Sequence, residues 1–156
     1  MEYKKKMKEL HVQDALEYTQ HIINAVHDPL IILFEDLKVA LASRSFYEFF
    51  NVTEHDTEGK FIYALGNHQW DIPRLRHLLE DILPKHTSFE NFEISHDFPG
   101  IGRKSMLVNA CRFYLEANRA KLIVLTIKDV TEHKEADGLR KKIADLEAEL
   151  KKSRNR

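Results

Sequence analysis

The hydrophobic and polar positions first form a helical pattern near the amino terminus. From about Lys8 to Val26, apolar residues recur in alternating steps of four and three, which predicts an amphipathic helix with a heptad-like stripe. Ile22 widens this stripe, so the helix can face both a partner and its own domain. Asp28-Pro29 ends the helix, because the residue before a proline avoids the helical region. The stripe consists of Val12, Leu16, Thr19, Ile23 and Val26.

The next segment predicts a β-hairpin followed by short helices. The apolar runs Leu30–Phe34 and Lys38–Ala42 flank a polar turn, as in two paired strands. Aromatic residues then gather on one helical face within Ser43–Phe50. A second helix is expected over Ile72–Leu83, with Asp71 as its N-cap.

Three further strands complete the central part of the chain. They are expected over about Ser88–Ser95, Lys104–Leu115 and Lys121–Val130, with Pro99-Gly100 in a type II turn. Strands and helices do not alternate, so a doubly wound parallel sheet is not expected. The simplest packing is an α+β fold: a five-stranded antiparallel sheet with short helices on one face and an amphipathic helix at each end.

The chain ends in a predicted helix from about Glu132 to Lys152. Its apolar positions follow a 3-4-3-4 spacing, and burying each large one recovers roughly 1.5–3 kcal/mol. A two-stranded parallel coiled coil is the simplest partner arrangement and predicts a homodimer, although an antiparallel pairing stays open. We expect three parts: a dimerisation helix (1–26), a domain (27–131) and a coiled-coil helix (132–156). The trailing stripe consists of Ala136, Leu139, Ile143, Leu146 and Leu150.

Composition and charge narrow the class of protein. The chain is 43% hydrophobic and 31% charged, as in ordinary globular domains, and its 24 basic and 25 acidic residues give a net charge of −1. This balance provides no overall field for nucleic acid or for an anionic membrane. A single cysteine, Cys111, excludes an intramolecular disulfide and fits a reducing compartment. With no signal peptide or membrane-spanning run visible, we expect a cytoplasmic chain, full length or cut from a larger protein.

Several stretches together resemble a PAS domain. Asp28–Leu33 followed by Ala42–Tyr47 resembles the opening of that fold, and Asp129-Val130-Thr131 resembles the D-I/V-T motif at its end. Leu65–Pro73 and His96–Arg103 are similar to a PAS subgroup of bacterial and archaeal histidine kinases and related chemotaxis proteins. The resemblance extends over most of the chain.

The resemblance implies a sensory and dimerisation module that acts on an output domain, such as a kinase, in a parent protein. Such domains bind a small molecule between sheet and helices, or bind nothing and relay. The resemblance also implies that Asp129 and Thr131 anchor the joint to the trailing helix, and both side chains can hydrogen-bond nearby backbone. The alternative is ordinary helix capping by Thr131 with a solvated Asp129.

Five residues are candidates for a ligand pocket. The polar loop around Trp70 suits ligand recognition, although tryptophan is equally common in protein cores. Asn109 interrupts an apolar strand, so it needs a partner if it faces the interior and none if it lies on the surface. The candidates are Asn67, His68, Trp70, His77 and Asn109.

The sequence identifies no cofactor. His77 lies near the place where haem-binding PAS domains carry their axial ligand, but its neighbours Arg74 and Arg76 indicate a polar face and argue against haem. Cys111, within N-A-C-R-F, superficially resembles a flavin-photosensor motif but falls on a late strand. We therefore expect no flavin, and interpret this thiol as buried and structural.

Enzymatic and metal chemistry lack support in the sequence. The histidines show no metal-ligand spacing, and there is no nucleophile–base pair, supported carboxylate pair or phosphate loop. His133 has no phosphoacceptor motif around it, so a solvated residue is expected. We expect a non-catalytic module, with two alternatives: a ligand-free connector that dimerises an output domain, and a small α+β enzyme with an unrecognised site.

Overall fold

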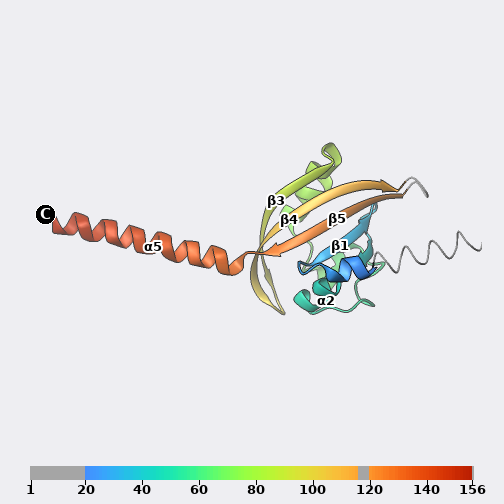
Figure 1. Ribbon diagram of the computed structural model, residues 1–156, viewed down its shortest axis with the longest axis horizontal. Coiled ribbons are helices and arrows are strands. Elements are labelled where there is room, and N and C mark those ends of the chain that lie inside the picture. Colours follow the sequence, from blue (N-terminus) through green and yellow to red (C-terminus); the bar gives the residue numbers. More distant parts are fainter. Residues whose placement is uncertain (1–19, 116–119, 156) are drawn as a thin grey trace, which may run out of the picture.

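The computed structural model describes residues 20–115 and 120–155, apart from the side chains of Leu115 and Ala120. Five antiparallel strands form one sheet in the order β2-β1-β5-β4-β3, and α5 runs away from it (Figure 1). This confirms the predicted α+β fold. The elements are β1 (Leu30–Phe34), β2 (Val39–Ala42), α2 (Arg44–Phe50), η1 (Ile62–Ala64), α3 (Leu65–His68), α4 (Pro73–Arg76), η2 (His77–Ile82), η3 (Leu83–Lys85), β3 (Ser88–Phe98), β4 (Gly102–Leu115), β5 (Ala120–Asp129) and α5 (Thr131–Arg154).

The leading helix is described only at its end. Residues 20–25 are helical, whereas Val12 and Leu16 of the predicted stripe lie outside the described residues. Ile23 is 6% exposed, while its neighbour Ile22 is 56% exposed. Of these two residues, it is therefore Ile22 that presents an apolar side chain to solvent.

Strand alternation decides which side chains reach the core. Val108 and Ala110 on β4 are buried, so Cys111 must point to the opposite face of the sheet, where it is exposed. The interpretation of Cys111 as a buried thiol is therefore wrong. The small and apolar residues around Cys111 did not reveal which alternate positions of the strand face the core. This alternation decides the face of the sheet to which each side chain points.

An aromatic cluster fills the space between α2 and the sheet. Phe46, Phe50, Trp70 and Phe98 have ring centroids 4.6–5.5 Å apart and are all buried. Ser43 fixes the start of α2, because its hydroxyl accepts from the Phe46 N–H (3.2 Å) and from the Leu30 N–H (3.0 Å). The cap thus ties α2 to β1.

The second predicted helix is present but irregular. It is built from α4, the π-helical segment η2 and the 3₁₀ turn η3, which together span residues 73–85. Asp71 is not its N-cap: that position is Ile72, which makes no side-chain capping bond. Asp71 instead accepts a 2.5 Å hydrogen bond from Arg76 Nε, because an ionic partner is available one turn further on.

The β3–β4 turn also differs from the prediction. Ile101 N–H donates to the Phe98 carbonyl (3.3 Å), but the left-handed residue is Gly102, with φ 83°, and not Gly100. A turn followed by a left-handed glycine suits the right-handed twist of a hairpin better than a type II turn does. This geometry also lengthens β3 to Phe98, whose ring joins the aromatic cluster.

Removing one ring from the aromatic cluster should destabilise the fold. Phe46→Ala leaves a cavity at a fully buried site and is expected to lower the free energy of unfolding by about 3–5 kcal/mol. Urea denaturation followed by circular dichroism measures the loss. Phe34→Ala, at a residue 45% exposed, is the matched control and should cost far less. Equal losses in the two variants would contradict this account of the core.

Candidate signal-coupling site

Side-chain hydrogen bonds fix the junction between β5 and α5. Asp129 is the last residue of β5, and its Oδ1 accepts from the Thr131 N–H at 3.0 Å and from the Thr131 hydroxyl. A carboxylate that accepts from the N–H two residues on fixes the local turn of the backbone. The direction in which the chain leaves the sheet is therefore set at these residues.

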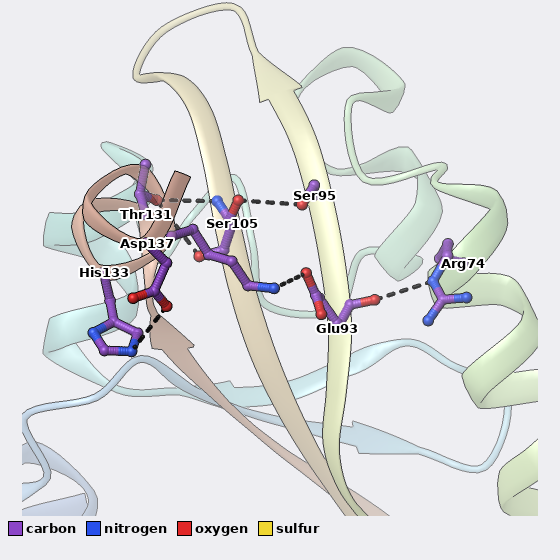
Figure 2. A network of polar contacts seen from close by, with 8 residues as sticks. Arg74, Glu93, Ser95, Ser105, Thr131, His133 and Asp137 are labelled. Carbon is purple, nitrogen blue, oxygen red and sulfur yellow. Dashed lines mark hydrogen bonds and ion pairs between the residues drawn. The ribbon is translucent and has the colours of Figure 1, made fainter. Parts of the chain in front are cut away.

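The same joint is held to the neighbouring strand. The Ser105 N–H on β4 donates to Thr131 Oγ1 (3.0 Å), and the Val130 N–H donates to the Ser105 carbonyl (2.9 Å). Figure 2 shows Thr131 and Ser105 facing each other across this junction. The N-cap of α5 is Val130, and it makes no side-chain capping bond. The Thr131 hydroxyl thus ties the helix to the sheet and does not cap it.

A second contact joins α5 to the edge of the sheet. Lys134 Nζ lies 2.6 Å from Glu93 Oε1 on β3, and both side chains are about half exposed. The Glu93 backbone carbonyl in turn accepts from Arg74 Nε of α4 at 3.0 Å (Figure 2). The Arg74 guanidinium also lies 4.5 Å from the centroid of the Phe92 ring. A continuous set of contacts therefore leads from α4 through β3 to α5.

A cavity of about 420 Å³ lies on the helical side of the domain, between α2 and the segment that leads into α4. Its apolar wall includes Phe46 and Trp70, and its polar lining includes Lys60 and Asn67. The wall near Asn67 has an unusual backbone, since residues 66–68 all have positive φ, between 57° and 67°. Such conformations cost of order 1–3 kcal/mol for a residue other than glycine and concentrate at functional sites.

The structure separates the five predicted pocket residues. Asn67 and Trp70 line the cavity, whereas His68 is exposed and does not line it. His77 is also exposed, and its Nδ1 lies 3.0 Å from Asp81 Oδ2. Asn109 lies on the outer face of the sheet, where its Oδ1 accepts from the Asn91 N–H (2.8 Å). Asn109 thus supports a bulge in β3 and is remote from the cavity.

The Arg76 side chain connects the loop before α4 to the core. Arg76 binds Asp71 and lies over the Tyr63 ring, with its guanidinium carbon 4.0 Å from the ring centroid. The hydrogen bond from Arg76 lowers the pKa of the Asp71 carboxyl. Burial raises the pKa of the Tyr63 hydroxyl, which is enclosed and has no hydrogen-bond partner within the described part of the chain. Arg76 thus joins the loop before α4 to a buried aromatic ring.

Metal-binding clusters and membrane-spanning helices are both absent from the described residues. Within residues 20–115 and 120–155, no three His, Cys, Asp or Glu side chains are grouped to hold a metal ion. No helix in these two described ranges has the length and apolar character needed to cross a bilayer.

Comparison with known proteins identifies the family. The family model of the PAS fold matches residues 17–130, so this chain belongs to the PAS family. Domains of this family are generally sensory, non-catalytic modules. A search of curated protein sequences found no match.

Several solved PAS domains share the fold. The PAS domain of Bordetella pertussis BvgS is 18% identical, with 87% of this chain and 98% of that one covered and a TM-score of 0.59. The PAS domain of an HTR-like protein from Haloarcula marismortui is 15% identical (80% and 98% covered, TM-score 0.57). That of nitrogen regulation protein NR(II) from Vibrio parahaemolyticus is 14% identical (71% and 96% covered, TM-score 0.57).

Removing the Thr131 hydroxyl should loosen the joint. Thr131→Val keeps the shape of the side chain but leaves the Ser105 N–H without its acceptor, so the domain should lose about 1–3 kcal/mol of stability. Exchange of the Ser105 amide, followed by NMR, should become faster. Thr126→Val, on β5, is the control. Unchanged exchange at Ser105 in the Thr131 variant would contradict the assigned hydrogen bond.

Proposed function

We propose that this chain is the sensory PAS module of a signal-transduction protein of the histidine-kinase type. In this proposal it works as a cytoplasmic, non-catalytic homodimer that relays a change in the domain to α5 and so to an output domain. The proposal keeps the division into a leading helix (1–26), a domain (27–131) and a trailing helix (132–156). One observation carries it: α5 leaves the sheet with an uncovered apolar stripe, while its first turn is tied to two strands.

The stripe supports dimerisation through α5. Leu139, Ile143, Leu146 and Leu150 are 56–63% exposed, and α5 extends away from the domain that would otherwise cover them (Figure 1). Burying these side chains against a second copy would stabilise the pair by roughly 1.5–3 kcal/mol for each one. In the leading helix, Val12 and Leu16 remain candidates for the same interface. Ile23 is buried, so Ile22 takes its place in the proposal.

The two contacts of α5 support the relay. Thr131 is bound to β4 and Lys134 is paired with β3, so a shift between these strands changes the direction of the helix. Coupling free energies of roughly 1–3 kcal/mol are enough for a switch. In this proposal α5 turns about Asp129 and Thr131. The ion pair between Lys134 and Glu93 sets the angle between α5 and the sheet.

The packing bears on the choice between a liganded sensor and a ligand-free connector. The space between helices and sheet is filled by the aromatic cluster, which favours relay without a ligand enclosed there. The cavity beside Asn67 and Trp70 is where a small molecule would bind if there is one. Haem and flavin find no support, because His77 is paired with Asp81 and Cys111 lies on the outer face.

The dimer should depend on the stripe. Leu146→Glu places two charges in the interface and is expected to give a monomer at micromolar concentration in analytical ultracentrifugation, with the domain still folded. Ala144→Glu adds the same charge outside the stripe, one residue after Ile143 and two before Leu146, and should remain dimeric. If the Leu146 variant stays dimeric, α5 does not hold the two copies together.

The angle of α5 should depend on the Glu93–Lys134 pair. Glu93→Lys replaces attraction by repulsion and should speed amide exchange in residues 131–138 roughly twofold to fivefold, since an exposed pair contributes roughly 0.2–1 kcal/mol. Adding Lys134→Glu restores the pair and should restore protection. Hydrogen exchange with mass spectrometry measures both, with Glu90→Lys on β3 as control. Failure of the double variant to recover would show that the pair does not orient the helix.

A further inference from the structure

We infer that the leading helix acts on the domain through α2, and that the Ser45 hydroxyl is the switchable link between them. In the proposed function α5 carries the output and the leading helix serves only in dimerisation. This contact adds a route by which a change at the amino-terminal side enters the domain. Both helices belong to one chain, so the link can fail while the proposed sensory dimer stands.

The Ser43 hydroxyl has a fixed direction of hydrogen bonding. Its oxygen accepts from the Leu30 N–H (3.0 Å) and from the Phe46 N–H (3.2 Å), which occupies both lone pairs. Ser43 is fully buried, so its proton is shielded from solvent, and Ser45 Oγ lies 2.8 Å away. Because a buried donor is normally satisfied, Ser43 donates to Ser45.

Ser45 is then left with one proton and two acceptors. Its Oγ lies 3.2 Å from the Val26 carbonyl and 3.1 Å from the Asp28 carbonyl. Val26 directly follows the last helical residue of the leading helix, whereas Asp28 lies in the bend before β1. A single O–H makes one full hydrogen bond at a time. The two near-equal distances therefore define two arrangements, one that holds the end of the leading helix and one that releases it.

Asn24 makes a second connection between the two helices. Its Oδ1 accepts from the Arg44 N–H at 3.1 Å, and Gln20 Nε2 donates to the same oxygen at 3.4 Å. Arg44 is the first residue of α2, where backbone N–H groups have no acceptor within the helix. The last turn of the leading helix supplies that acceptor, and α2 lies beside it (Figure 1). A rotation of the leading helix about its axis would withdraw this acceptor from α2.

The contact continues through α2 into the core. Phe46, the residue after Ser45, has its ring 5.5 Å from Trp70, and both rings line the cavity. Phe50, one turn further along α2, lies 5.5 Å from Phe98 at the end of β3. Because close-packed interiors transmit strain, a shift of α2 reaches the cavity wall and β3, the strand whose ion pair holds α5.

Variants of Asn24 test the connection from the side of the leading helix. Asn24→Ala removes the acceptor of the Arg44 N–H, so exchange of this amide, followed by NMR, should become roughly twofold to tenfold faster. Asn24→Asp keeps an acceptor oxygen and should keep the protection. Asn24 lies at the partly exposed end of the leading helix, so the domain should remain folded in both variants. Unchanged exchange in the alanine variant overturns the inference.

Variants of Ser45 test how far the contact reaches. Ser45→Ala should speed exchange of residues 20–25 by a similar factor and shift the fluorescence emission of Trp70, the single tryptophan of the chain. Ser45→Thr retains the hydroxyl and should behave like the unaltered protein, as should Glu48→Ala at an exposed position of α2. Asn24→Ala, which leaves α2 itself unaltered, should shift the emission in the same direction. Faster exchange with unchanged Trp70 emission would show a purely local contact, which overturns the inference and leaves the proposed function standing.

Discussion

The end of β5 constrains everything that leaves the domain. β5 is the middle strand of the sheet, paired with β1 on one side and β4 on the other, and Asp129 is its last residue. Directly beyond it, Val130 and Thr131 bind backbone groups of Ser105. A helix that begins within two residues of the central strand cannot move independently without leaving these groups unpaired, at a cost of roughly 1–3 kcal/mol each. The origin of α5 therefore follows β4 and β5.

One fixed point does not set a direction, and here the two contacts of α5 differ in strength. Thr131 is held by hydrogen bonds to the Ser105 backbone and to the Asp129 carboxylate, whereas Lys134 and Glu93 form a half-exposed ion pair that contributes at most about 1 kcal/mol. The origin of the helix is firm and its angle is adjustable. Because the Glu93 backbone carbonyl also accepts from Arg74, the weaker contact is the one that is connected to α4. A relay needs this combination of a rigid pivot and a weak second contact.

Local patterns predicted the elements well, because strand runs, the α2 cap region and the trailing heptads are each defined by neighbouring residues. The five antiparallel strands and the apolar stripe of α5 follow from such patterns. The D-V-T joint was expected only from the resemblance to the PAS family, and the order of the strands in the sheet was not predicted. Features that depend on tertiary partners did not follow. The face of the sheet on which Cys111 lies became clear only once the alternation of buried and exposed positions along β4 was known. Asp71 binds Arg76 and does not cap the helix, because the Arg76 side chain is within hydrogen-bonding distance. Nothing in the sequence connects Glu93 to Lys134, since sheet register alone brings them together.

The two faces of α5 have a mechanical consequence for the proposed dimer. A paired apolar stripe would resist rotation of the helix about its axis, because rotation exposes apolar side chains that each contribute roughly 1.5–3 kcal/mol. The Lys134–Glu93 pair on the opposite face resists rotation far less. When β3 moves relative to β4, the weaker contact yields first. In the proposed dimer the coil would then remain intact as one rigid body and each domain would turn on it at Thr131, so the proposed output is a change in the angle between the domains and the coil.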